Sequence, residues 1–294
     1  MNKGIIYGMG AYFIWGFMLV WLRQIKGVPP LQILGHRVAW SFVLLFAIIL
    51  LRKDFGGLIK SIRAWRTLRI YTTAALLLAS NWLVYIYAIN ADHIVESSLG
   101  YFINPLVNVS MGVVFFRERL RRWQWVPVGI AAVGVTYLAF DYGRLPWIAL
   151  GLAFTFGLYG LTKKIAPLGS LHGLTLETAL LFLPSLLFLG GMESQGAGWF
   201  SHHGIYQDIM LVAAGVITAV PLLLFSEAAR RIPLSMLGLL QYIAPTCQFL
   251  LGVLVYREPF ALTRLVGFVI IWIALVIFWM EGFSHYRRTV LAVV

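Results

Sequence analysis

Long apolar segments alternate with short polar ones along almost the whole chain. Ten runs carry few or no charged residues: Gly4–Leu22, Leu31–Leu51, Ile70–Asn90, Ser97–Phe116, Trp123–Phe140, Leu145–Thr162, Gly173–Met192, Ile209–Ser226, Pro233–Tyr256 and Phe260–Met280. Each run has about the 20 residues that a helix needs to cross a hydrocarbon core of roughly 30 Å. Open strands would leave backbone polar groups without partners in lipid, and barrel strands would alternate apolar and polar residues. The pattern predicts an all-α membrane protein with ten transmembrane helices in a lipid bilayer.

The composition agrees with this class. Of 294 residues, 61% are hydrophobic and only 12% are charged, whereas soluble domains carry about 25% charged residues. The net charge of +12 would suggest nucleic acid in a soluble protein, but the basic residues lie in short connections, so no nucleic-acid partner is expected. Cys247 is the single cysteine. Without Cys/His clusters, no metal and no cofactor are expected.

The basic residues are distributed unevenly between the two sets of connections. With the N-terminus in the cytoplasm, 17 Lys and Arg fall on the cytoplasmic side and 5 on the outer side, and Arg37, further inside a run, is counted on neither side. Cytoplasmic loops of membrane proteins are enriched in Lys and Arg. The bias predicts a multi-pass protein of the inner (cytoplasmic) membrane with both termini in the cytoplasm.

The second half of the chain repeats the first. A shift of 140 residues aligns 80–120 with 220–260 without a gap, and the matches include Pro105 with Pro245, Gly112 with Gly252 and Arg117-Glu118 with Arg257-Glu258. We therefore divide the chain into units 1–141 and 142–294. Five helices per unit is an odd number, so the units have opposite orientations. Inverted repeats are typical of secondary transporters, which bind substrate at the interface between the two halves.

Two segments carry a family resemblance. The sequences YFINPLVNVSMGVVFFRERL (101–120) and YIAPTCQFLLGVLVYREPF (242–260) resemble the EamA repeat of the drug/metabolite transporter superfamily. The segments GAYFIWG (10–16), ILGHRVAWS (33–41) and SNWLVYIYAIN (80–90) are similar to RarD-type permeases of that superfamily. The resemblance covers essentially the whole chain. It implies a ten-helix bundle that exports small metabolites, amino acids or amphiphilic drugs such as chloramphenicol-like compounds, and it does not fix the substrate.

A secondary transporter working by alternating access as a monomer or homodimer is therefore our first interpretation. The chain contains no HExxH, GxSxG or P-loop motif, so we do not expect an enzyme. Two alternatives stay open: a sensor or interaction protein that does not transport, and an intramembrane enzyme that modifies lipids. Neither needs an inverted repeat.

Ionisable side chains within lipid-spanning segments are costly and usually face the bundle interior. Arg37 either extends its charge to the outer interface or contacts substrate or a neighbouring helix. His36 is a candidate for substrate binding and for proton coupling. Glu177 and Glu227 are the other proton-coupling candidates, and the alternative for each is a solvated or ion-paired end residue, with Lys163 or Lys164 for Glu177 and Arg230 for Glu227. Glu96 is expected at the interface.

Amides and aromatic side chains inside the runs supply candidate cavity surface, and helix packing is the alternative for each. Together with His36 and Arg37, the substrate-binding candidates are Trp15, Trp40, Asn81, Tyr85, Tyr101, Asn104, Asn108, Tyr159, Gln241 and Tyr242.

Two repeated features are assigned structural roles. Pro105 and Pro245 each remove a backbone donor, so we predict that both kink their helices and act as hinges. Glu118 and Glu258 follow the aromatic ends of their helices, where an ion pair or a helix-end contact is expected.

Overall fold

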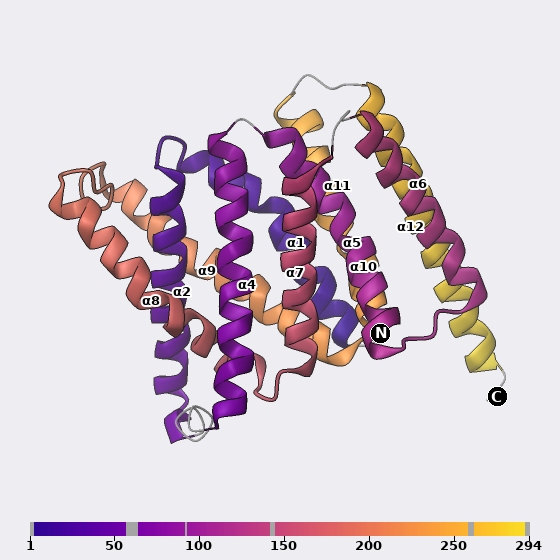
Figure 1. Ribbon diagram of the computed structural model, residues 1–294, viewed down its shortest axis with the longest axis horizontal. Helices are drawn as coiled ribbons and strands as arrows, with labels where there is room; N and C mark the ends of the chain where they lie inside the picture. Colours follow the sequence, from indigo (N-terminus) through magenta and orange to yellow (C-terminus); the bar gives the residue numbers. More distant parts are fainter. Residues whose placement is uncertain (1–2, 57–63, 92, 142–144, 258–261, 292–294) are drawn as a thin grey trace.

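The protein is described by a computed structural model that covers residues 3–56, 64–91, 93–141, 145–257 and 262–291 (Figure 1). The elements within these ranges are α1 (Lys3–Gln24), α2 (Pro30–Leu51), α4 (Trp65–Asn90), α5 (Ile94–Phe116), η1 (Arg122–Gln124), α6 (Trp125–Asp141), α7 (Trp147–Ile165), α8 (Ser170–Ser194), α9 (Ile205–Arg231), α10 (Leu234–Leu240), α11 (Ile243–Leu250), η2 (Leu251–Val255) and α12 (Leu262–Leu291). Every element found in this part of the chain is helical, as the apolar runs predict.

The ten predicted spans correspond to these helices. In the described part of the chain, nine helical segments are long and apolar enough to cross a membrane, and α12 adds a shorter apolar stretch, Leu265–Glu281. Helix α2 begins at a proline. The first N–H groups of a helix have no partner within the helix, so a residue without an N–H group is well placed there. The all-α ten-span fold is confirmed.

The packing of the helices follows the inverted repeat. Helix α1 packs on α9 and α11, and its counterpart α7 packs on α4 and α5. The pairs α2–α8, α5–α10 and α6–α12 each join an element to its own counterpart in the other half. Figure 1 shows α6 and α12 side by side at one edge of the bundle.

Glycines allow the two halves to approach closely. A Cβ atom on Gly16 of α1 would lie 2.6 Å from Cβ of Cys247 on α11. The counterpart of Gly16 is Gly157 of α7, where a Cβ atom would lie 2.8 Å from Val107 of α5. Small residues let helix backbones meet at short distance in a membrane, so this matched pair fixes the two symmetry-related crossings.

The ninth span differs from the sequence expectation. The run Pro233–Tyr256 was expected to form one kinked helix, but it is divided into α10, α11 and the π-helical turn η2. The break falls at Gln241 and Tyr242, directly before Pro245. A proline lacks an N–H group and its ring clashes with the carbonyl four residues earlier, which places the break at Gln241. Pro105, in contrast, lies within the continuous helix α5.

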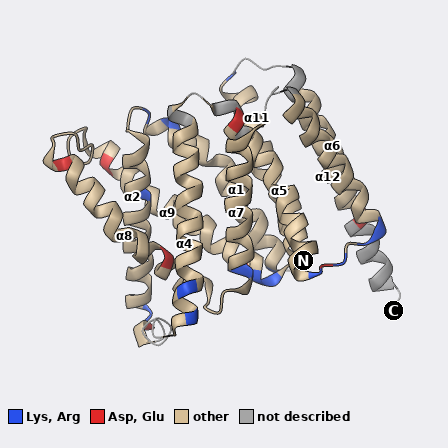
Figure 2. Ribbon diagram, viewed as in Figure 1, with Lys and Arg blue, Asp and Glu red and all other residues tan. Residues whose placement is uncertain are grey.

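The two ends of the bundle differ in charge. We call the end at which α1 and α8 begin the amino-terminal face, and the end at which α2 and α7 begin the opposite face. Figure 2 shows that most of the coloured Lys and Arg residues lie at the amino-terminal face. The charge bias of the sequence thus corresponds to one physical face of the bundle.

Candidate functional site

A cavity lies between the two halves of the bundle, from its middle toward the opposite face. About 870 Å³ at this place is not filled by protein atoms, and this volume includes space open to solvent. Helices α1, α2, α4, α5, α7, α9 and α11 contribute lining residues, so both repeat units form its walls. The polar side chains that line it are Arg37, Asn81, Ser97, Asn104, Gln241 and Gln248. The aromatic ones are Tyr12, Trp15, Trp82, Tyr85, Tyr101 and Phe156.

The amides are tied to neighbouring helices. Asn81 of α4 donates from Nδ2 to the carbonyl oxygen of Leu152 and to Oγ1 of Thr155, at 2.9 Å each. Gln248 donates to the carbonyl oxygen of Trp15 at 3.2 Å. An amide in an apolar surrounding needs a hydrogen-bond partner, and these bonds hold polar atoms beside the cavity at fixed positions.

The helix break in the ninth span places Gln241 in this site. Asn108 of α5 donates from Nδ2 to Oε1 of Gln241 at 2.8 Å and to Oδ1 of Asn104 at 3.4 Å. Asn104 and Asn108 share a helix face, as their spacing predicts. The contact therefore links the two repeat units within one turn of Pro105 and just over one turn from Pro245 in the sequence.

Arg37 points into the bundle. Its Nε donates to Oγ1 of Thr218 on α9 at 2.9 Å, and its Cζ lies 4.9 Å from the ring centroid of Trp82. The interpretation that Arg37 extends to the outer interface is wrong. Its hydrogen-bonded contact with α9 and its place in the cavity wall correspond to the other interpretation.

Several aromatic lining residues contact one another in pairs. The rings of Trp15 and Phe156 meet edge to face, with centroids 5.7 Å apart, and Tyr85 and Tyr101 meet at 6.3 Å. The hydroxyl of Tyr12 is buried and has no hydrogen-bond partner among the described residues. The cavity thus offers aromatic surface, and its lining includes one hydroxyl that no described residue satisfies.

Toward the amino-terminal face the cavity ends on a packed layer. The rings of Tyr159 and Phe225 stack with centroids 5.9 Å apart, and both side chains are fully buried together with Leu234 and Leu237. This layer separates the cavity from the charged face below it.

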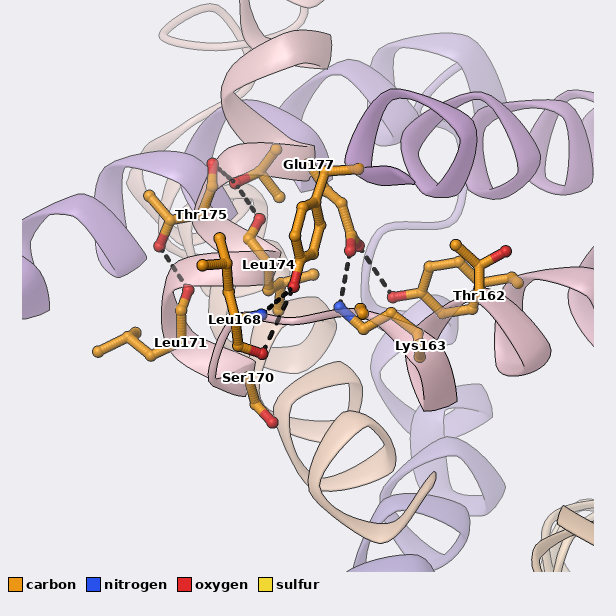
Figure 3. A network of polar contacts seen from close by, with 12 residues as sticks. Thr162, Lys163, Leu168, Ser170, Leu171, Leu174, Thr175 and Glu177 are labelled. Carbon is orange, nitrogen blue, oxygen red and sulfur yellow. Dashed lines mark hydrogen bonds and ion pairs between the residues drawn. The ribbon is translucent and has the colours of Figure 1, made fainter. Parts of the chain in front are cut away.

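A buried ion pair lies beyond this layer. Figure 3 shows Glu177 of α8 beside Lys163 of α7, with its carboxylate joined to the ammonium group. Nζ of Lys163 lies 2.7 Å from Oε1 of Glu177, and the hydroxyl of Tyr159 donates to Oε2 at 3.0 Å. The two charged side chains are 3% and 0% exposed. Of the alternatives for Glu177, the ion pair with Lys163 is the one observed.

Glu118 joins the two halves at the amino-terminal face. Its carboxylate accepts hydrogen bonds from the N–H groups of Leu234 and Ser235 at 2.7 and 2.9 Å and from the Ser235 hydroxyl at 2.7 Å. Nζ of Lys164 lies 3.3 Å from Oε1 of Glu118. A carboxylate at a helix N-terminus satisfies donors that have no partner within the helix, so Glu118 makes the expected helix-end contact, with α10. Glu258 lies outside the described residues.

The pKa of Glu118 reflects two opposed effects, of which burial alone would raise it. The hydrogen bonds from Ser235 and Leu234 and the positive charge of Lys164 outweigh burial, and the pKa is lowered from its ordinary value. The carboxylate is therefore held in its charged form.

Two further carboxylates differ from expectation. Glu227 pairs with Arg231 at 2.7 Å and accepts from Ser170 at 2.7 Å, whereas Arg230, its expected partner, donates to the carbonyls of Ala166 and Leu168. Glu96 was expected at the interface, but it is 0% exposed and accepts the N–H of Ile148 at the start of α7. Unpaired N–H groups at helix starts explain this burial.

The cavity contains seven of the twelve substrate-binding candidates: Trp15, Arg37, Asn81, Tyr85, Tyr101, Asn104 and Gln241. The other five lie outside its lining. His36 and Trp40 contact Phe200, and Tyr159 belongs to the layer below. Asn108 lies behind Asn104 and Gln241, to which it donates, and Tyr242 donates to the carbonyl of Phe102. His36 and Arg37 are adjacent on α2, so a helix turns their side chains to different faces.

Sequence reasoning missed Trp82 and Phe156 as lining residues. Phe156 lies four residues after the lining residue Leu152, so the two share a helix face, and this spacing carries the signal for Phe156. Nothing in the sequence separates Trp82 from other aromatic residues of an apolar run.

An all-helical bundle with two inverted halves around a polar and aromatic cavity defines a multi-pass membrane protein of the transporter type. The profile of the EamA-like transporter family matches residues 2–140 and 145–280. The chain belongs to this family, within the drug/metabolite transporter superfamily, and it is a RarD-like member.

Similar proteins support the same placement. The chain is 44% identical to "Protein RarD" of Streptomyces exfoliatus, over 98% of this chain and 91% of that protein. It is 43% identical to "Uncharacterized transporter YojE" of Bacillus subtilis, over 94% and 93% of the two chains. "Chloramphenicol-sensitive protein RarD" of Pseudomonas aeruginosa is 25% identical, over 94% and 93%. A solved crystal structure shares the fold at a TM-score of 0.70, with 17% identity over 95% of this chain and 98% of that chain.

Proposed function

We propose that this protein is a secondary transporter that exports small molecules across the inner membrane by alternating access. The cavity between the inverted halves supports this proposal most strongly, because its walls come from both repeat units. In an inverted repeat the two halves can exchange arrangements around such a site.

We also propose an orientation. The amino-terminal face carries the excess of Lys and Arg, which favours the cytoplasmic side. Both termini then lie in the cytoplasm, and the cavity lies toward the outer side. The layer of Tyr159, Phe225 and Leu234, together with the contacts of Glu118, separates it from the cytoplasm in this arrangement.

The proposed substrates are small metabolites, amino acids or amphiphilic drugs such as chloramphenicol-like compounds. Aromatic walls with a few fixed polar groups are typical of sites for such molecules. The printed name of the Pseudomonas aeruginosa relative refers to chloramphenicol sensitivity.

The test is flux in proteoliposomes made with the purified full-length protein and a panel of metabolites and drugs, with and without a pH gradient. Asn81→Leu removes a lining amide, and we expect it to reduce flux of a transported compound. Leu187→Ala changes a side chain that is 68% exposed on α8, and it serves as the matched control with unchanged flux. If no compound crosses the membrane, the transport proposal is wrong, and the sensor and lipid-modifying alternatives take its place.

Proton coupling is a separate proposal. Glu177, Glu227 and His36 are the candidate groups, and none of the three lines the cavity. Flux that ignores the pH gradient would refute this coupling while leaving transport intact.

A further inference from the structure

The cavity has an unbalanced charge. Arg37 is its one charged side chain among the described lining residues. The remaining polar groups on these walls are amides and hydroxyls, and none of the described lining residues is Asp or Glu. A guanidinium group does not lose its proton in proteins, so the lining carries a positive charge without a carboxylate beside it.

Neighbouring carboxylates are already engaged elsewhere. Glu96, one residue before the lining residue Ser97, accepts the N–H of Ile148 and does not line the cavity. Glu177 is paired with Lys163 beyond the aromatic layer. Within the described part of the chain, no carboxylate is therefore placed to neutralise Arg37.

The guanidinium is held in one orientation with part of it unused. Nε donates to Oγ1 of Thr218, and Cζ lies over the ring of Trp82, 4.9 Å from its centroid. The described residues provide no hydrogen bond to Nη1 or Nη2, and the Arg37 side chain lines the cavity. Two parallel N–H groups of a guanidinium match the two oxygens of a carboxylate.

We propose that the preferred substrate is an organic monoanion, a carboxylate attached to an aromatic body, and that Arg37 binds its carboxylate through Nη1 and Nη2. This inference rests on the proposed transport function and names the substrate class of the same cavity. The aromatic body lies against the walls formed by Trp15, Tyr101 and Phe156. The unpartnered hydroxyl of Tyr12 is a further donor for an acceptor on the substrate.

The charge balance also ranks related molecules. A zwitterion such as an amino acid brings an ammonium group that finds no carboxylate among the described lining residues, and only cation–π contacts would offset its lost hydration. A cationic amine meets repulsion from Arg37. A phosphate carries more negative charge than one guanidinium neutralises. The site therefore favours an aromatic monocarboxylate over its amino-acid, amine and phosphate relatives.

The test uses four probes of one shape: 3-phenylpropionate, its neutral amide, phenylalanine and phenethylamine. Binding to the full-length protein in nanodiscs is measured by calorimetry, and flux is measured by counterflow in proteoliposomes. We expect the wild type to bind 3-phenylpropionate at least tenfold more tightly than each other probe. Arg37→Gln should remove this preference without weakening the binding of the amide, and Arg37→Lys should retain part of it because the charge stays and the fork is lost.

Arg23→Gln is the matched control, because Arg23 also lies over an aromatic ring, that of Tyr256, and does not line the cavity. It should leave the order of the four probes unchanged. Equal or tighter binding of the amide or the amine by the wild type overturns the anion inference, and flux of either would leave the transport function standing. Binding of 3-phenylpropionate without flux supports the site and counts against transport.

Discussion

Removal of one partner of the buried ion pair should destabilise the protein strongly, and removal of both should not. Lys163 and Glu177 lie 2.7 Å apart and are 3% and 0% exposed. Tyr159 donates to the second carboxylate oxygen. In Lys163→Met the carboxylate keeps only this one hydrogen bond, and in Glu177→Leu the ammonium keeps only ring contacts with Tyr71 and Tyr159 at 5.6 and 5.7 Å.

The expected magnitudes follow from the cost of an isolated charge. Breaking a buried pair by removing one partner costs about 3–5 kcal/mol, and replacing both partners by apolar residues is often neutral or stabilising. At about 1.4 kcal/mol per factor of ten, each single variant should shift the unfolding equilibrium by about two to three and a half orders of magnitude. In the double variant the Tyr159 hydroxyl lacks its acceptor, which costs about 1–3 kcal/mol. Adding Tyr159→Phe should recover this loss.

The assay is reversible unfolding in mixed micelles with increasing dodecyl sulfate, followed by tryptophan fluorescence. The wild type, both single variants, the double variant and the triple variant complete the cycle. The double variant should be more stable than either single variant. If the two single losses simply add, the pair does not act as a coupled unit and the argument from burial is wrong.

Three further outcomes are expected. Because the pKa of Glu118 is lowered in the folded protein, its carboxylate stabilises the fold at pH values above the ordinary pKa of glutamate, about 4.3. This stabilisation is lost as the pH falls through the lowered pKa. Glu118→Gln should therefore remove this step from an acid titration of stability, and an unchanged step would contradict the assignment to Glu118. Exchanging Pro105 and Pro245 together for Ala should reduce flux more than membrane insertion, measured by counterflow and by the amount of folded protein; normal flux would refute the hinge. Gly16→Val places a side chain against Cys247 at the 2.6 Å approach and should lower stability by about 1–3 kcal/mol in the same unfolding assay, whereas a stable variant would show that α1 and α11 can separate.

The sequence predicts the fold well because membrane insertion leaves strong patterns. Apolar run length and loop charge follow directly from bilayer thickness and lipid polarity. The repeat register also holds at the level of the backbone: Arg117 and Arg257, matched by the 140-residue shift, have positive φ values of 52° and 51°. Left-handed residues commonly end helices, so both copies end their fourth helix in the same way.

The site is less predictable, because side-chain direction depends on how the helices rotate against each other. Arg37 and His36 are neighbours in sequence, yet Arg37 bonds to Thr218 while His36 lies against Phe200. The partners in ion pairs are equally hard to predict from the sequence. Glu227 reaches Arg231, four residues on, rather than Arg230, because residues four apart share a helix face.

The broken ninth span and the unbroken fourth span are two forms of one repeated element. At Pro245 the chain breaks at Gln241 and Tyr242, whereas α5 continues through Pro105. The 140-residue shift maps this break onto Tyr101 and Phe102, and Tyr101 lines the cavity. An inverted repeat that exchanges its arrangements would therefore transfer the break to Tyr101 and close α10 and α11 into one helix. Such an exchange would move Gln241 away from Asn108, whose bond joins the two units, and it would alter the wall of the cavity at the two proline-containing elements, which also carry the close contacts of Gly16 and Gly157.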